Sequence, residues 1–221
     1  AVSLLLSING LFQSFVNSMA IVVFPNLKTL ERHMWSRVYV YLRGFLGLLV
    51  YFILVFFYPI KTLLEVWFVD YGPSLKYVVL ILPVLVYEAK MFLLVNVYFK
   101  AMRKEGSLLI VNLFTLLIAV VLMFVFALWM KNIFLSVLSI LILSAVRSVI
   151  SEILLCVWLE VDALVKAAVD SALMTAFLIA SWVLEGVVGS VVYFVAYGIY
   201  FASNLPLMKE VFRLTRKRFF V

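Results

Sequence analysis

The segment Leu75–Gly106 constrains the fold more than any other part of the chain. It opens with about 25 predominantly apolar residues, enough for one helix to cross a bilayer. Glu88 and Lys90 lie in its middle, and Pro83 interrupts it. Each charge at membrane depth costs ~2.5–3.5 kcal/mol on insertion scales, so such charges are rarely kept without a role. Either they form an ion pair that only holds helices together, or they line a polar path inside a helix bundle, which we favour.

The composition extends this interpretation to the whole chain. Of its 221 residues, 67% are hydrophobic and only 13% are charged, and the mean hydropathy is +1.23. Soluble domains are far more polar than this. We therefore predict an all-α polytopic membrane protein with one transmembrane domain, in which Pro25 and Pro59 end the first two spans. The predicted spans are 1–24, 38–58, 75–99, 108–130, 133–159, 164–184 and 187–205, followed by a basic tail at 206–221.

The basic residues predict how these spans are oriented. If span 1–24 runs inward, thirteen of the 18 Lys and Arg residues fall on the inner side, three fall outside and two lie within the membrane. This asymmetry predicts a cytoplasmic membrane location with the C-terminus in the cytoplasm, and it explains the net charge of +7 without a nucleic-acid partner. Membrane lipids are the expected partners, and the expected headgroup contacts are Lys28, Arg32, Arg37 and a snorkelling Arg43.

Two predicted spans carry polar residues along one helical face. Small polar residues at helical spacing suit close packing between membrane helices, and they suit equally well the wall of a water-filled cavity. Both interpretations stay open for the first span. In the fifth span the serines share a face with Arg147, so that face points at protein or water rather than lipid. The candidate cavity-lining residues are Ser7, Ser14, Asn17, Ser144 and Ser151.

Five ionisable residues inside the predicted bundle are candidates for substrate binding or coupling: Arg147, Glu88, Lys90, Asp170 and Glu152. At 1.5 Å per residue, Glu88 and Arg147 each lie ~20 Å below the outer end of their own helix, so an interhelical ion pair between them is possible. Lys90 lies about 200° around the helix from Glu88 and must face elsewhere, toward Glu152 or a substrate anion.

Catalytic and cofactor motifs are missing from the sequence. There is no phosphate loop, no H-E-x-x-H zinc motif and no G-x-S-x-G nucleophile elbow. Cys156 and His33 are the single residues of their kinds, so the chain has no internal disulfide and no Cys/His metal signature. We therefore expect neither an enzyme nor a cofactor or metal centre.

A series of short motifs resembles one transporter family. The segment MAIVVFPNLKTL ends the first predicted span, and FFYPI, WFVDYGPS, VNVYFKAMRKEG, LLIVNLFTLL and SILILSAVRSVISE follow in order. In this respect the chain resembles polysaccharide repeat-unit flippases of the multidrug/oligosaccharidyl-lipid/polysaccharide exporter superfamily. The resemblance covers about the last seven helices of a fourteen-helix protein, and it implies that these helices form most of one lobe of such a transporter.

The resemblance also implies a function. A flippase of this kind turns a polyprenyl-diphosphate-linked oligosaccharide across the cytoplasmic membrane by alternating access between two lobes. The anionic diphosphate would then meet Arg147 and Lys90. Because the sequence starts without Met and with a span that enters from outside, we expect an N-terminal lobe to precede it. The alternatives are a cation-coupled multidrug exporter of the same superfamily, or a non-transporting membrane subunit or enzyme of envelope polysaccharide synthesis.

Overall fold

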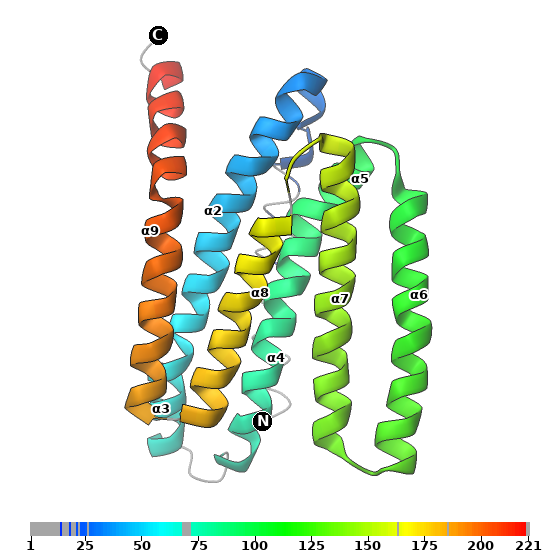
Figure 1. Ribbon diagram of the computed structural model, residues 1–221, viewed down its shortest axis with the longest axis vertical. Coiled ribbons are helices and arrows are strands. Elements are labelled where there is room, and N and C mark those ends of the chain that lie inside the picture. Colours follow the sequence, from blue (N-terminus) through cyan, green and yellow to red (C-terminus); the bar gives the residue numbers. More distant parts are fainter. Residues whose placement is uncertain are drawn as a thin grey trace.

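The regular elements that the structure describes are all helical (Figure 1). The computed structural model describes residues 14, 18, 21, 23–25, 27–67, 72–162, 164–184 and 186–219. The helices in chain order are η1 (Arg32–Met34), α2 (Trp35–Val55), α3 (Phe57–Trp67), α4 (Gly72–Lys90), η3 (Met91–Val95), α5 (Asn96–Ala101), α6 (Glu105–Met123), η4 (Phe124–Trp129), α7 (Ile133–Leu159), α8 (Leu164–Ile179), η5 (Ala180–Leu184) and α9 (Gly186–Phe219). The segments η3, η4 and η5 are π-helical continuations of the helices before them.

Six helical stretches in the described part of the chain are long and apolar enough to cross a membrane. They are Arg32–Leu63, Tyr77–Ala101, Glu105–Trp129, Ile133–Leu159, Val165–Leu184 and Gly186–Glu210. They correspond one by one to the last six predicted spans, so the all-α membrane fold class is confirmed. The predicted span 1–24 lies almost entirely outside the described residues, as do Ser7 and Asn17. Ser14 is described, and it is helical and exposed.

Consecutive spans alternate in direction. In Figure 1, α2, α6 and α8 run one way, while α4, α7 and α9 run the other way. The start of α2, the turns α5–α6 and α7–α8, and the C-terminal part of α9 therefore meet at one end of the bundle, which we call the basic end. Lys100, Arg103 and Lys104 lie there, whereas Lys61 and Lys131 lie at the opposite end.

Proline positions predicted two helix ends that the structure places differently. Pro25 is itself helical, residues 27–29 are helical too, and the bend comes at Leu30, so helical structure extends beyond the predicted end at Phe24. The break after α2 falls at Phe56, and Pro59 lies in the first turn of α3. A proline in a first turn breaks no helical hydrogen bond, because the N–H groups there have no partner within the helix.

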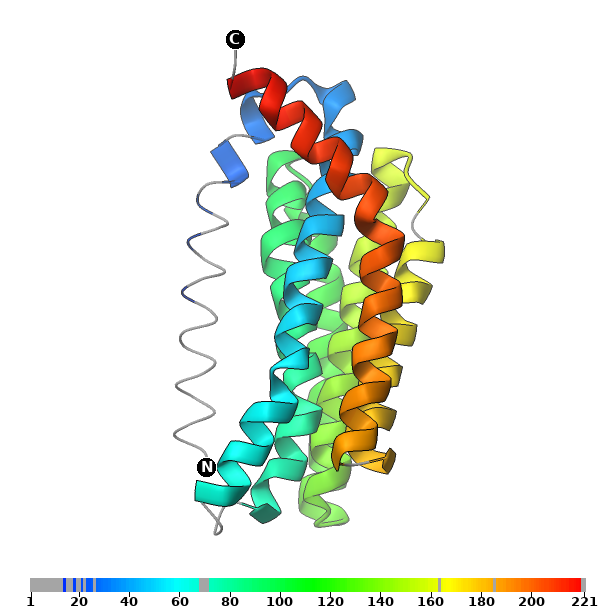
Figure 2. The ribbon, with the colours of Figure 1, turned by 90° about the vertical axis from the view of Figure 1, so that its left-hand side faces the viewer.

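The predicted tail 206–221 is also placed differently by the structure. The last helix does not end at Leu205 but continues to Phe219 with Pro206 inside it. Figure 2 shows α9 changing direction in this region and leaning across the basic end. A proline inside a helix removes one backbone hydrogen bond and bends the axis, which the polar basic end tolerates.

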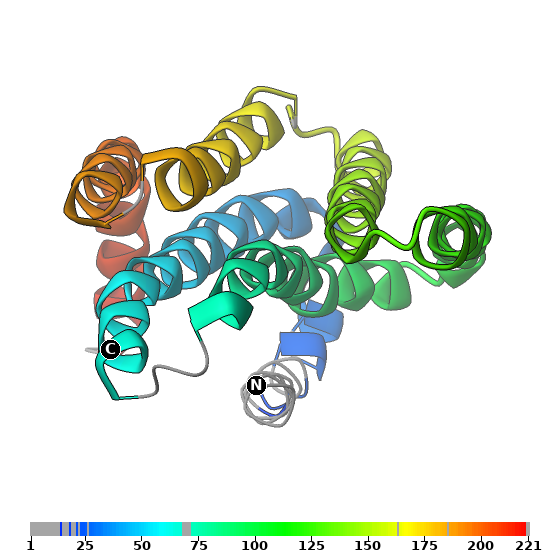
Figure 3. The ribbon, with the colours of Figure 1, turned by 90° about the horizontal axis from the view of Figure 1, so that it is seen from below.

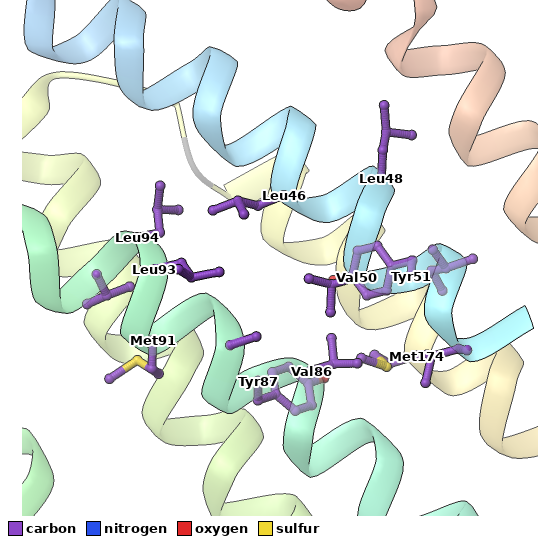
Figure 4. Close-up of a cluster of buried hydrophobic side chains, with 14 of the residues drawn as sticks. Leu46, Leu48, Val50, Tyr51, Val86, Tyr87, Met91, Leu93, Leu94 and Met174 are labelled. Carbon is purple, nitrogen blue, oxygen red and sulfur yellow. The ribbon is translucent and has the colours of Figure 1, made fainter. Parts of the chain in front are cut away.

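The centre of the bundle is formed by α2 and α4, with α6 at its outer edge (Figure 3). Figure 4 shows apolar side chains of α2, α4 and η3 packed together with Met174 of α8. By contrast, α6 leaves large apolar side chains such as Leu109, Ile110 and Phe114 exposed, as expected for a helix that faces lipid. The serines of α7 lie mostly inward, as predicted, with Ser136, Ser139, Ser148 and Ser151 buried.

A row of tyrosines fastens α9 to α2. Tyr193 donates a hydrogen bond to the Tyr51 carbonyl at 3.1 Å, and Tyr197 donates one to the Leu48 carbonyl at 3.0 Å. One turn further along α9, Tyr200 packs beside Gly47, where an added Cβ would lie only 2.4 Å from the tyrosine oxygen. The glycine therefore gives Tyr200 the space to reach into the bundle.

Candidate functional site

Four buried charged residues, each from a different helix, meet inside the bundle. Arg43 comes from α2, Lys90 is the last residue of α4, Glu152 lies on α7 and Asp170 lies on α8. Their exposed fractions are 7%, 6%, 1% and 3%. We call these four residues the charged cluster. Their formal charges cancel, so the cluster brings no net charge into the bundle.

Each cation of the charged cluster bridges both carboxylates. Arg43 Nε contacts Glu152 Oε1, and Arg43 Nη2 lies 2.8 Å from Asp170 Oδ2. Lys90 Nζ lies 3.1 Å from Glu152 Oε2 and 2.6 Å from Asp170 Oδ2. Buried charges are tolerated where excellent geometry and further hydrogen bonds compensate for lost hydration. This closed arrangement meets that condition and ties α2, α4, α7 and α8 together.

Two tyrosines complete the charged cluster. Tyr39 donates to Glu152 Oε1 at 3.1 Å, and Tyr200 donates to Asp170 Oδ1 at 3.3 Å. The Cys156 thiol in turn lies 3.2 Å from the Tyr39 hydroxyl. Each carboxylate thus accepts hydrogen bonds from two cations and one tyrosine. Neither Tyr39 nor Tyr200 was a sequence candidate, although the regular spacing of Tyr193, Tyr197 and Tyr200 was a readable signal.

A second charged feature, the Glu88–Arg147 pair, lies farther from the basic end than the charged cluster. Arg147 Nη2 contacts Glu88 Oε1, which confirms the geometry of the predicted interhelical ion pair. The side chain of Arg147 is 26% exposed and that of Glu88 is 23% exposed. Arg147 Nε has no hydrogen-bond partner among the described residues. Arg147 lies twelve residues before the end of α7, hence ~18 Å from the basic end, whereas Glu152 lies ~10 Å from it.

The two features lie on different faces of the helices that they share. Lys90 lies about 200° from Glu88 around α4, and Glu152 lies about 140° from Arg147 around α7. Lys90 accordingly reaches Glu152, one of the two partners expected for it, while Glu88 reaches Arg147. The π-helical segment η3 begins directly after Lys90. Such segments occur frequently at functional sites and are not readable from apolar periodicity.

Two connected cavities open between α2, α8 and α9. The inner cavity measures about 200 Å³ and reaches the charged cluster at Arg43 and Asp170. The outer cavity measures about 800 Å³ and opens widely at the basic end. Val40, Lys166 and Leu207 line both, so the outer cavity leads into the inner one. Other lining residues are Tyr200, Ser203 and Asn204 of the inner cavity and Arg37, Tyr41, Glu160, Asp162 and Glu210 of the outer one.

Some expected positions differ from the structure. Arg43 does not snorkel toward headgroups, because its guanidinium is buried between Glu152 and Asp170. Lys28, Arg32 and Arg37 are exposed, and their headgroup contacts stay predictions. Ser144 is partly buried, and Ser151 is fully buried with its hydroxyl unpartnered among the described residues. Neither serine lines the inner or the outer cavity.

The described residues contain no group of three or more His, Cys, Asp or Glu side chains that could hold a metal ion. No protein-family model, curated protein or solved structure matches the chain. The helices and their apolar spans define its class, an all-helical multi-pass membrane protein.

Proposed function

We propose that this chain forms most of the C-terminal lobe of a flippase-type transporter. Together with an N-terminal lobe it moves a polyprenyl-diphosphate-linked oligosaccharide across the cytoplasmic membrane by alternating access, with the basic end in the cytoplasm. The observation that carries the proposal is the Glu88–Arg147 pair, an ion pair at mid-depth that is partly exposed.

The chemistry of the pair suits exchange with an anionic substrate. Glu88 holds Arg147 through one guanidinium nitrogen, and the Arg147 Nε keeps an unused donor. A guanidinium binds phosphate oxygens through two parallel hydrogen bonds, which a single carboxylate contact does not match. An arriving diphosphate therefore competes with Glu88 for Arg147, and that competition biases the lobes toward closure.

The charged cluster has a different part in this proposal. It fixes α2, α4, α7 and α8 relative to one another, so Arg147 is held on a rigid frame. The carboxylates of Glu152 and Asp170 are each matched by two cations. A cation-coupled exporter needs carboxylates that are free to take up the coupling ion, so this charge balance supports the flippase over that alternative.

The test exchanges the two charges of the pair. Glu88→Arg combined with Arg147→Glu is reconstituted in proteoliposomes together with the N-terminal lobe, and flipping of a fluorescent polyprenyl-diphosphate sugar is measured. Size-exclusion chromatography reports folding separately, and Lys100→Gln, an exposed cation at the basic end, is the control. We expect the exchanged pair to restore folding without restoring transport. Full transport by the exchanged protein would leave the pair a purely structural one and overturn the proposal.

A further inference from the structure

We propose that the inner cavity is a binding pocket for a phosphoryl anion that arrives from the basic end. The pocket lies between α2, α8 and α9, on a different side of the charged cluster from the α4–α7 contact that carries Glu88 and Arg147. It is therefore a second site, and it does not depend on the transport proposal.

Lys166 is a cation of the pocket that no described carboxylate pairs with. Lys166 lines both cavities and is only partly buried. It forms no ion pair or hydrogen bond with any residue that the structure describes. A lysine in a confined polar cavity keeps three N–H donors to satisfy, and an anion satisfies them best.

The carboxylate of Asp170 in the cavity wall already has its hydrogen-bond partners. Asp170 accepts hydrogen bonds from Arg43, Lys90 and the Tyr200 hydroxyl. Arg43 spends its Nε and Nη2 groups on the two carboxylates, and its Nη1 group makes no hydrogen bond within the described part of the chain. The unused hydrogen-bond donors of the cavity therefore belong to its cations, although its formal charges include Asp170.

The neighbouring polar residues do not replace these cations. Ser203 and Asn204 both donate to the Tyr200 carbonyl, at 2.7 and 2.9 Å. Their donors are thus spent within α9. Recognition of an anion rests on Lys166 and Arg43, and Lys166 is the one that can be removed without breaking an ion pair of the charged cluster.

The outer cavity allows an anion to approach in spite of its mixed charges. Glu160 and Asp162 are exposed to solvent at the α7–α8 turn, and Glu210 is exposed on α9. Repulsion by exposed carboxylates is weak in water, where two unit charges 4 Å apart interact by only ~1 kcal/mol. Arg37 and Lys166 supply the attraction along the same path.

The size and position of the inner cavity admit a phosphoryl group. The inner cavity of about 200 Å³ is several times the ~30 Å³ that one water molecule occupies in the liquid. Lys166 lies two residues into α8, at the start of the apolar stretch Val165–Leu184, and such helix ends are where phospholipid headgroups are expected. A phospholipid monoester and the diphosphate of a lipid-linked sugar or a soluble pyrophosphate share this chemistry.

The experiment uses the whole chain in phosphatidylcholine nanodiscs. One arm titrates sodium pyrophosphate by calorimetry, against sodium sulfate at equal ionic strength. The other arm adds phosphatidic acid to the nanodiscs and counts retained phosphatidate by native mass spectrometry. Lys166→Gln is the test variant, Lys166→Arg keeps the charge, and Lys100→Gln is the matched control because Lys100 is exposed at the same end and lines neither cavity.

We expect Lys166→Gln to weaken binding at least tenfold, Lys166→Arg to retain it, and Lys100→Gln to change it less than twofold. If Lys166→Gln weakens pyrophosphate binding in the calorimetric arm, the ligand is a soluble phosphoryl anion. If it lowers phosphatidate retention in the nanodisc arm, the ligand is a lipid headgroup. Equal weakening by Lys166→Gln and Lys100→Gln, or no preference for pyrophosphate or phosphatidate in either arm, overturns the pocket. Such a failure leaves the Glu88–Arg147 exchange test unaffected, because that test measures transport.

Discussion

The charged cluster and the Glu88–Arg147 pair share helices α4 and α7, yet their surroundings differ. In the charged cluster each carboxylate accepts two cations and a tyrosine, and all four charged side chains are at least 93% buried. In the pair, each charge has one assigned partner and about a quarter of each side chain is exposed. The burial and pairing of these charged residues therefore differ with the number of helices that enclose them.

This difference has a physical consequence for function. Four helices enclose the charged cluster, so opening it would leave several buried charges unpaired, and it serves best as a fixed frame. Only α4 and α7 contribute to the pair, so a competing anion can replace one partner at a much lower cost. Each of the following variants tests this division of roles.

The largest effect is expected from Glu152→Ala. This variant leaves Arg43 and Lys90 buried with Asp170 alone, and removing one partner of a buried ion pair costs about 3–5 kcal/mol. Thermal unfolding in detergent should show a strongly destabilised protein or no folded protein. The control is Asp162→Ala, an exposed carboxylate at the same end, which should cost less than about 1 kcal/mol. Equal stability of the two variants would contradict the role of the charged cluster as a frame.

Gly47→Ala should have the next largest effect. The new Cβ would lie 2.4 Å from the Tyr200 oxygen, so Tyr200 must move away from Asp170. Overpacking of this kind costs about 1–3 kcal/mol. Gly198→Ala on α9 is the matched control, because nothing lies within 4 Å of its added Cβ and a helical Gly→Ala change gains about 0.5–1 kcal/mol. If both variants unfold at the same temperature, the close contact between α2 and α9 is not needed.

Arg147→Ala should cost less stability than Glu152→Ala. The Glu88–Arg147 pair is partly exposed, so we expect Arg147→Ala to lower the free energy of unfolding by roughly 1–2 kcal/mol, between the values for surface and buried ion pairs. Under the proposed function, transport should nevertheless be abolished, because the variant lacks the guanidinium proposed to bind the diphosphate. Parallel measurement of thermal unfolding and flipping separates the two effects. A loss of stability as large as that of Glu152→Ala would remove the distinction between the pair and the charged cluster.

The smallest effect is expected from Tyr39→Phe. It removes one neutral donor from Glu152. A hydrogen bond to a charged group contributes about 1.5–3 kcal/mol, and we expect a loss at or below the lower end of that range because the carboxylate keeps both cations. The same change takes away the partner of the Cys156 thiol. Chemical unfolding of Tyr39→Phe beside Glu152→Ala measures this. A loss of several kcal/mol would show that the tyrosine, rather than the cations, holds the carboxylate.

The sequence by itself determined the membrane class and the six described spans, and it placed Glu88 and Arg147 at one depth, where an ion pair was possible. Membrane thickness sets the length of an apolar span, and this local property can be read without a fold. Depth follows from counting residues along a helix, which is why two residues in different spans were placed at one level.

Only the tertiary structure decided how Arg43 is used, which helices surround Lys90, and where the cavities lie. Arg43 sits near a helix start, where snorkelling and burial look alike until α7 and α8 bring Glu152 and Asp170 beside it. The first turn of α3 accepts Pro59, and α9 continues through Pro206, because a proline's effect depends on its place in the helix and on what surrounds it. Burial and pairing arise from residues far apart in the chain, so they belong to the packed bundle rather than to any one of its helices.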